Sequence, residues 1–339
     1  GLYMLIFLAL IVGLSLTLYA FRGASVRARD PFNILSRETF LLLNNVILLT
    51  ALVTVLLGTI YPLIIEALNL GKISVGPPYF NAVFVPLMAP LLFFMGIGPQ
   101  SYWQAMPPAL LLARLRTIFI ICLSVAVLLP WIVADRFSAG VSLGLGLAIW
   151  IIMTSLNGYV RRVFAQPGNK WLALIRIPRA YYGMLVAHIG VGLCVIGITL
   201  TSHYSIERDI RLALGEQTTL GSYQFNFSNI RDTEGSNYQG VAAEFIVTKE
   251  DKIVAQLYPQ KKYYTVAEQV MGEPGIKAGL WRDLYVALGE PLAENEWSLR
   301  LYYKPFVRWI WLGSLWIIAG GLLAMSDRRY YQKKVTNHA

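Results

Sequence analysis

The sequence has few charged residues. Asp, Glu, Lys and Arg make up 14% of its 339 residues, whereas 56% are hydrophobic, and the mean hydropathy is +0.54. Soluble domains carry about a quarter charged residues. Several apolar runs approach or exceed the roughly 18 residues that a helix needs to cross a bilayer. The composition therefore argues against a soluble domain and predicts a polytopic membrane protein.

Cysteine and histidine are also scarce. The two cysteines, Cys122 and Cys194, lie within apolar runs and form no Cys-x-x-Cys pair, which argues against a disulfide framework, a thiol-redox site and a zinc site. There are three histidines, His188, His203 and His338. His188 alone lies well inside an apolar run, and apart from weakly acidic Tyr and Cys no other ionisable side chain reaches such a depth.

The apolar runs predict seven spans, at about residues 2–21, 39–66, 82–97, 117–134, 138–157, 181–202 and 306–326. Residues 1–202 then form a membrane domain of six spans. Residues 306–339 form the last span and a tail. The chain opens with Gly1 inside an apolar run, with no initiator Met before it, and we read it as lacking an upstream part.

Residues 203–305 have a different pattern. Alternating runs such as SYQFNFSNI, GVAAEFIVTK, KIVAQLYPQ, KKYYTVA, DLYVALG and WSLRLYY are separated by DTEGSN, EPG and GEPLAEN. Period-two patterning with Gly, Asp and Asn breaks predicts short antiparallel strands. The fold class is thus a polytopic α-helical membrane protein with a small extracytoplasmic β-rich domain, sandwich or barrel, between the last two spans. Its strands hold no Ser-His-Asp set and no metal-ligand cluster, which favours docking over catalysis.

The net charge of +10 is distributed as in a membrane protein and not as in a nucleic-acid-binding one. The segments after spans one, three, five and seven hold fifteen basic residues against Asp30, Glu38 and Asp327. Basic loops face the cytoplasm. This rule predicts a cytoplasmic C-terminus and an external 203–305 segment.

Three interpretations of His188 are open from the residues. It is a histidine hydrogen-bonded to a neighbouring helix, a proton-relay step, or an axial haem ligand. The relay lacks acidic or His partners at depth, whereas neutral imidazole is a standard haem iron ligand. The small residues Gly183, Ala187, Gly190, Cys194 and Gly197 form a stripe that lets another helix approach closely. Gly192, one turn after His188, is expected to leave room beside the imidazole. His203 lies about 22 Å along the same helix, so no second ligand is available.

Two further polar features stand out. Asn44 and Asn45 lie inside LLLNNVILL, where paired amides are most often contacts between helices; a ligand contact is the alternative. The segment 69–81 is rich in turn formers and reads as a rigid surface connection. Tyr79 and Phe80 are expected at headgroup level, as an interfacial anchor or as a partner contact.

Four motifs occur in a fixed order: SRETFLLLNN (36–45), SVGPPYFN (74–81) followed by Pro86 and Pro90, GMLVAHIGVGLCVIGI (183–198) and GLWRDLYVALGEP (279–291). Together they resemble the C-terminal half of CcmF-type proteins, the membrane haem lyase components of system I cytochrome c maturation. The resemblance to the nitrite-reductase paralogue is weaker. It covers essentially the whole chain.

The resemblance implies a function. Such proteins receive haem from the haem chaperone CcmE and attach it to the Cys-x-x-Cys-His of an apocytochrome c outside the bacterial inner membrane. A b-type haem within the membrane serves the reduction of the substrate haem, and one axial ligand to its iron matches His188. The external domain would dock the subunits that present the apocytochrome, of CcmH or CcmI type.

The resemblance also implies what this chain should not do alone. The second axial histidine of haem b and the W-G-x-W-x-W-D segment that handles substrate haem are expected upstream of Gly1. No catalytic residue is therefore assigned. A transporter or export subunit, with the proline-containing spans two and three as its pathway, is the alternative; the lack of charged residues at depth weakens it. A purely structural anchor for the external domain is a third interpretation.

Overall fold

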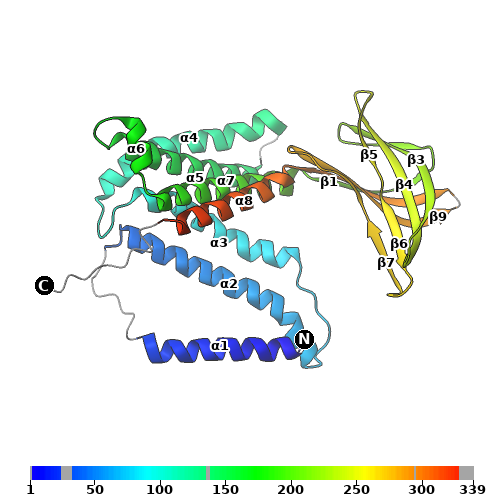
Figure 1. The fold of residues 1–339 in the computed structure, drawn as a ribbon, viewed down its shortest axis with the longest axis horizontal. Helices are drawn as coiled ribbons and strands as arrows, with labels where there is room; N and C mark the ends of the chain where they lie inside the picture. The colour runs from blue at the N-terminus through cyan, green and yellow to red at the C-terminus, as the bar shows by residue number, and fades with distance from the viewer. Residues whose placement is uncertain (1, 24–32, 135–137, 294, 328–339) are drawn as a thin grey trace. The chain divides into compact units, whose positions relative to one another are not determined.

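The computed structural model describes residues 2–23, 33–134, 138–293 and 295–327 (Figure 1). Within these residues, seven helices are long and apolar enough to cross a membrane, and a two-sheet β-domain lies between the sixth and the seventh of them in the chain. The predicted fold class, apolar helices with a β-rich domain between the last two, is confirmed, and the extracytoplasmic location of that domain stays a prediction. By their contacts the residues divide into two compact units, 1–129 with 146–178, and 130–145 with 179–339. The division into 1–202, 203–305 and 306–339 stays a prediction.

The long helices are α1 (Leu2–Arg22), α2 (Arg37–Ala67), α3 (Pro77–Ile97), α4 (Pro108–Ala134), α5 (Ala139–Phe164), α7 (Arg179–Tyr204) and α8 (Val307–Met325), and α6 (Lys170–Arg176) is short. Two helices begin earlier than expected, at Pro77 rather than 82 and at Pro108 rather than 117. Proline is favoured in the first turn of a helix, where its missing N–H would have no partner. The proline pairs therefore begin these helices, although the sequence interpretation placed Pro77 in a loop and Pro108 in an interfacial helix before the span.

In the first unit, aromatic side chains at the start of α3 pack against α2. A Cβ at the buried Gly58 of α2 would collide with the ring of Tyr79 and lie 3.2 Å from Phe80. The hydroxyl of Tyr79 donates to the carbonyl of Thr54 at 3.1 Å. Tyr79 and Phe80 thus lie in the first turn of α3 against α2, and the expectation that segment 69–81 is a connection throughout was wrong at its end.

The stretch between α3 and α4 is held by two arginines. The guanidinium of Arg37 donates to the carbonyls of Pro99 and Ser101, both at 3.0 Å, and that of Arg114 donates to the carbonyl of Gln100 at 2.9 Å. These interactions satisfy carbonyls beyond the end of α3 that have no partner within the helix.

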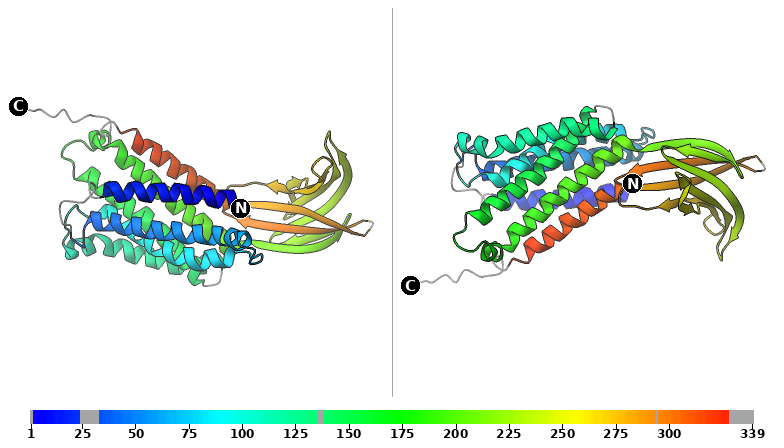
Figure 2. Two further views of the ribbon diagram at one scale, coloured as in Figure 1. Left: turned by 90° about the horizontal axis from the view of Figure 1, so that it is seen from below. Right: turned by 90° about the horizontal axis from the view of Figure 1, so that it is seen from above.

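In the second unit, α7 and α8 lie side by side (Figure 2). A Cβ at Gly183 would lie 2.5 Å from the carbonyl oxygen of Gly320, and one at Gly190 would lie 2.7 Å from that of Gly313. At Gly197 the nearest atom is the amide nitrogen of Ile310, at 2.7 Å. Side chains do not tolerate such distances, so the two backbones meet directly. The predicted close approach along the small-residue stripe is confirmed, and α8 is the helix that makes it.

Both ends of this pair are fixed by hydrogen bonds. The carboxylate of the buried Asp327 accepts from the amide of Ala180 at 2.9 Å, where a negative charge also suits the N-terminus of α7. At the other end, the hydroxyl of Thr201 donates to the carbonyl of Pro305 at 2.6 Å. The chain therefore leaves α7 and returns to α8 at neighbouring points.

The β-domain is a sandwich. One sheet has the order β1-β10-β9-β8, and the other has the order β2-β3-β4-β6-β7 with β5 paired to β4. The strands are β1 (Ile206–Ala213), β2 (Gln217–Leu220), β3 (Tyr223–Glu234), β4 (Tyr238–Lys249), β5 (Lys252–Leu257), β6 (Gln260–Tyr264), β7 (Gln269–Glu273), β8 (Gly275–Lys277), β9 (Arg282–Ala293) and β10 (Glu296–Pro305). The six alternating runs named above correspond to β3, β4, β5, β6, β9 and β10. The expectation of short strands was wrong for β3, β4 and β9, which have 12 residues each.

Aromatic and aliphatic side chains from both sheets fill the sandwich. Phe225, Phe227 and Phe245 are fully buried against Leu284 and Leu301 of the opposite sheet, and the rings of Phe227 and Phe245 stack at 4.8 Å. Burying an aromatic side chain of this size stabilises the fold by roughly 1.5–3 kcal/mol. The alternation along β3 and β9 places these residues on one face, which is why the sequence pattern was readable.

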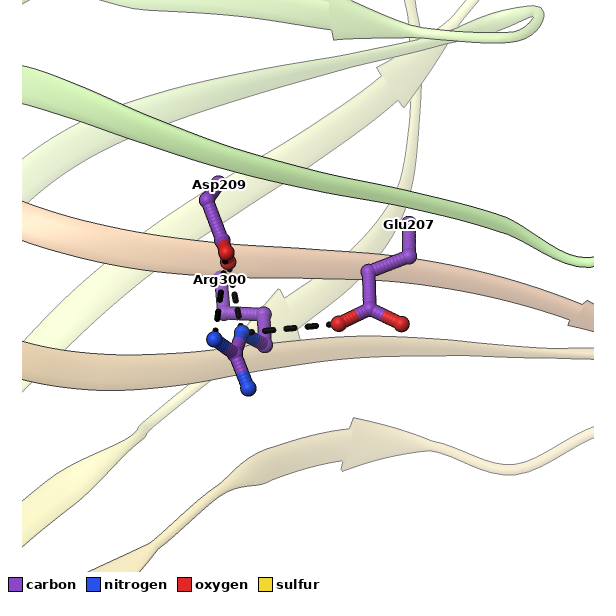
Figure 3. A network of polar contacts seen from close by, with 3 residues as sticks. All are labelled: Glu207, Asp209 and Arg300. Carbon is purple, nitrogen blue, oxygen red and sulfur yellow. Dashed lines mark hydrogen bonds and ion pairs between the residues drawn. The ribbon is translucent and has the colours of Figure 1, made fainter. Parts of the chain in front are cut away.

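An exposed ion-pair network links β1 to β10 (Figure 3). Arg300 pairs with Asp209 at 2.5 Å and with Glu207 at 3.5 Å. The hydrogen bond from Arg300 holds the pKa of Asp209 below its usual range. Exposed pairs of this kind contribute little to stability, so the apolar core, and not this network, determines the fold.

The close contact of α7 and α8 gives a test with a matched control in one helix. We expect Gly320→Ala to lower the thermal unfolding midpoint of the purified protein by several degrees, because its Cβ would lie 2.5 Å from the carbonyl oxygen of Gly183 and overpacking costs about 1–3 kcal/mol. At the adjacent Gly321, no atom lies within 4 Å of the place that a Cβ would take, so Gly321→Ala should leave the midpoint unchanged or raised. Equal midpoints for both variants would contradict the contact.

Candidate functional site

The imidazole of His188 is oriented by its own helix. Its Nδ1 lies 2.8 Å from the carbonyl oxygen of Met184, one turn earlier in α7. A carbonyl only accepts hydrogen bonds, so Nδ1 carries the proton and the neutral ring presents the lone pair of Nε2. No described residue forms a hydrogen bond with Nε2. A histidine that ligates a metal commonly has this arrangement, with one ring nitrogen fixed by a hydrogen bond and the other free for the metal.

His188 lies away from the α8 contact. At 100° per residue it stands roughly 140° around α7 from Gly183, whereas the stripe that begins at Gly183 is covered by α8. The stripe is therefore covered by α8 and gives no room to a ligand. Because α8 packs on the stripe, on the opposite side of α7, the imidazole of His188 is directed away from α8.

The same face of α7 carries Thr199 and His203 farther along. Thr199 lies only about 20° around the helix from His188, and its hydroxyl packs on Gly144 of α5 so closely that a Cβ there would collide with it. His203 repeats the ring geometry, with Nδ1 3.0 Å from the carbonyl oxygen of Thr199. Its Nε2, however, is 2.5 Å from where a Cβ at Gly140 would stand, so α5 covers that nitrogen.

Gly192 is buried in the structure. It lies about 40° around the helix from His188 and so shares its face, as expected. Whether it provides space for a ligand stays a prediction. Among the described residues no group of three or more His, Cys, Asp or Glu side chains could hold a metal ion, and the assignment of His188 as a haem ligand stays a prediction.

The amides of Asn44 and Asn45 interact with each other. The side-chain nitrogen of Asn44 donates to the side-chain oxygen of Asn45 at 3.3 Å on an exposed part of α2. No hydrogen bond from either amide to another helix occurs among the described residues. The predicted contact between helices thus has no described partner, and a ligand contact stays a hypothesis.

The GLWRDLYVALGEP motif forms the junction of sandwich and helices, a role that sequence reasoning missed. The carboxylate of Asp283 accepts from the amide of Gly279 at 2.9 Å and pairs with Arg308 of α8 at 3.3 Å. The rings of Trp281, Phe306 and Trp309 lie against one another with centroids 5.3–5.7 Å apart. The clustering of Trp, Arg and Asp just before an alternating strand was the available signal, but only the fold brings Arg308 to Asp283.

Comparison with known proteins agrees with this architecture. Residues 203–305 match the family model described as the CcmF C-terminal β-sandwich. The chain is 41% identical over 334 residues to the cytochrome c-type biogenesis protein CcmF of Haemophilus influenzae, covering 97% of this chain and 51% of that protein. This chain is similar to CcmF over almost its whole length.

Other CcmF relatives give the same result. The CcmF of Pseudomonas fluorescens is 43% identical over 98% of this chain and 50% of its own length. The biogenesis protein NrfE of Haemophilus influenzae is more distant, at 33% identity over 98% of the chain and 51% of its own length. A solved cytochrome c haem lyase CcmF shares the fold with a TM-score of 0.72 at 24% identity, over 87% of this chain and 46% of that one. The chain thus spans about half the length of the CcmF proteins that it matches.

The ring geometry can be tested directly. We expect nitrogen-15 NMR spectra of histidine-labelled protein at neutral pH to show His188 with its proton on Nδ1, because only a donor there satisfies the carbonyl of Met184. His188→Ala assigns the signal by its loss, and His203→Ala serves as the control on the same helix. A proton on Nε2 of His188 instead would contradict the assigned orientation, because the lone pair would then be on Nδ1, which faces the carbonyl of Met184.

Proposed function

We propose that this chain is part of the haem lyase that attaches haem covalently to apocytochrome c. It would contribute a transmembrane ligand for a b-type haem and an external docking domain. The observation that carries the proposal is the free Nε2 of His188, on a chain that is similar to CcmF proteins over 97% of its length. The chemistry of the donor fits the group, since imidazole is a standard axial ligand of haem iron.

The residues around His188 have defined tasks in this proposal. The carbonyl of Met184 holds the proton on Nδ1 and fixes the ring plane. The α8 contact keeps α7 from rotating, because glycines at three successive points leave no freedom for a different register. A b-type haem, when bound, would supply a one-electron redox centre for reduction of the substrate haem. The second axial histidine would come from outside this chain, since His203 is covered by α5.

We further propose a location in the bacterial inner membrane, with residues 203–305 in the periplasm and the C-terminus in the cytoplasm. The basic segments named above support this orientation. Substrate haem would be handled by a segment outside this chain and delivered by the chaperone CcmE.

The sandwich would bind the subunits that present the apocytochrome, of CcmH or CcmI type. Apolar side chains stand exposed on the β6–β7 hairpin: Tyr263 and Val270, 44% and 55% exposed, are cross-strand partners, and Val266 between them is 88% exposed. Exposed apolar groups that lie together are a common feature of protein interfaces. We place the docking surface at this hairpin.

A transporter or export subunit is the competing function. A pathway through α2 and α3 would use the prolines that interrupt them. Pro62 in α2 and Pro86 and Pro90 in α3 all lie inside continuous helices. Charged side chains, which transport pathways usually carry, are absent from the apolar centre of both helices. The haem hypothesis is therefore favoured.

The haem ligand is tested by the visible spectrum of the complete protein complex. We expect the low-spin b-type signal to be lost or strongly diminished in His188→Ala, because one axial ligand is removed. His203→Ala, with the same ring geometry on the same helix, should retain the signal. A haem content and spectrum unchanged by His188→Ala would refute the ligand assignment.

The docking surface is tested by capture of the purified apocytochrome-presenting subunit. We expect Tyr263→Ser combined with Val270→Ser to weaken capture by about tenfold or more, as is typical when buried aromatic anchors are removed. Ile253→Ser, at a residue of β5 that is 64% exposed, is the matched control and should bind normally. Capture that survives removal of residues 205–304 would exclude the sandwich as the docking domain.

A further inference from the structure

A groove of about 640 Å³ lies in the first unit, between α3, α4 and α5. One face of α4 forms its longest wall, with Ala109, Leu112 and Phe119 at helical spacing. Ile97 of α3 lies opposite, and Leu35, which precedes α2, also lines it. Almost the whole lining is apolar, and the one charged side chain in it is Arg116.

The groove has a fixed aromatic floor. Trp150 of α5 is only 3% exposed, and its indole N–H donates to the carbonyl of Phe93 at 2.9 Å. The ring of Phe93 stacks on Trp150 at 5.6 Å, and Phe119 meets Trp150 edge-on at 6.0 Å. Because the indole nitrogen is already satisfied, the floor offers an occupant no polar group. An apolar chain suits it.

The length of the groove matches one half of a bilayer. From Pro108 to Ile120, both in its lining, α4 rises about 18 Å at 1.5 Å per residue. The hydrocarbon core of a bilayer is about 30 Å thick, so one leaflet is about 15 Å deep. A segment of an acyl chain therefore fits along this wall beside Trp150.

Arg116 adds a positive charge to the otherwise apolar groove. It is exposed within the groove wall, and no described carboxylate forms an ion pair with it. The neighbouring Arg37 and Arg114, by contrast, are bound to backbone carbonyls. Helical side chains lean toward the N-terminus, so the guanidinium of Arg116 leans toward the end of the groove that begins at Pro108. A cation among apolar walls at a membrane requires an anion.

We propose that this groove is a binding site for an anionic phospholipid. One acyl chain lies along α4 over Trp150, and the phosphate pairs with Arg116, whose planar guanidinium matches phosphate oxygens. Basic pockets between membrane helices bind anionic lipid headgroups in the same way. The site is independent of His188 and of the sandwich.

Quenching of tryptophan fluorescence by brominated lipids tests the site. The protein is reconstituted in phosphatidylcholine bilayers that contain a small fraction of brominated phosphatidylglycerol or, in a parallel series, brominated phosphatidylcholine. The contribution of Trp150 is the difference between the wild type and Trp150→Phe. We expect phosphatidylglycerol to quench this contribution at severalfold lower mole fraction than phosphatidylcholine.

The variants decide between a site and ordinary surrounding lipid. Arg116→Gln should reduce quenching by phosphatidylglycerol to the phosphatidylcholine level, whereas Arg161→Gln, at an exposed arginine on α5 outside the groove, should not. Equal quenching by the two lipids in the wild type would mean surrounding lipid only and would overturn the proposal. Full competition by free inorganic phosphate would also overturn it, because the occupant would then be an anion without a chain.

Native mass spectrometry gives a readout that does not depend on Trp150. We expect the wild type and Arg161→Gln to retain one phosphatidylglycerol molecule more than Arg116→Gln under the same detergent conditions. Ala109→Phe, which narrows the groove and keeps the arginine, should lose the same molecule. Retention that is identical in all four proteins would refute the site even if Trp150→Phe failed to fold.

Discussion

The contact on which the second unit depends is the meeting of two helix backbones without side chains between them. In α7 and α8, Gly183, Gly190 and Gly197 face the backbone of the other helix at distances that exclude any Cβ. In lipid, helices gain nothing from hiding apolar surface from water, so close van der Waals packing must hold them together. The orientation of His188 on α7 follows from that pair.

Two consequences follow for function. The covered stripe leaves the opposite face of α7 for polar chemistry, and His188, Thr199 and His203 all lie there. The hydrogen bonds at the two ends, from the amide of Ala180 to Asp327 and from the hydroxyl of Thr201 to Pro305, prevent sliding of one helix along the other. The orientation of the imidazole is thus a property of the helix pair and its ends, and not only of the turn that contains Met184.

Much of this architecture was readable in the sequence, for physical reasons. Apolar length fixes the spans and period-two alternation fixes the inward residues of long strands such as β3 and β9. Small residues at spacings of three and four predicted the close helix contact. The predictions that failed concern details of local conformation or contacts between residues far apart in the chain. Pro77 looks like a loop residue until its position at a helix start is known, and β8, with three residues, is too short to show alternation.

The candidate site was likewise predictable from the sequence only in part. Burying an ionisable side chain in an apolar span costs free energy, so a lone histidine there indicates a function. His188 was therefore recognised from the sequence. Gly192 lies on the face of His188 as expected, but the spacings of the small residues did not show which neighbouring helix covers the stripe. The junction of Trp281, Asp283 and Arg308 and the groove over Trp150 join residues far apart in the chain, and only the fold reveals them.

The connection between helices and sandwich has a last consequence. One residue, Ser205, joins α7 to β1, and one residue, Phe306, joins β10 to α8. Phe306 takes a left-handed conformation with φ of 54°, unfavourable for a side chain of this size, and is held by a hydrogen bond to the carbonyl of Trp281 at 2.9 Å. Topologically the sandwich is an insert in an antiparallel helical hairpin. Because both connections are a single residue long, neither can act as a flexible linker. A force applied to the sandwich would therefore be transmitted to the helical hairpin as torque.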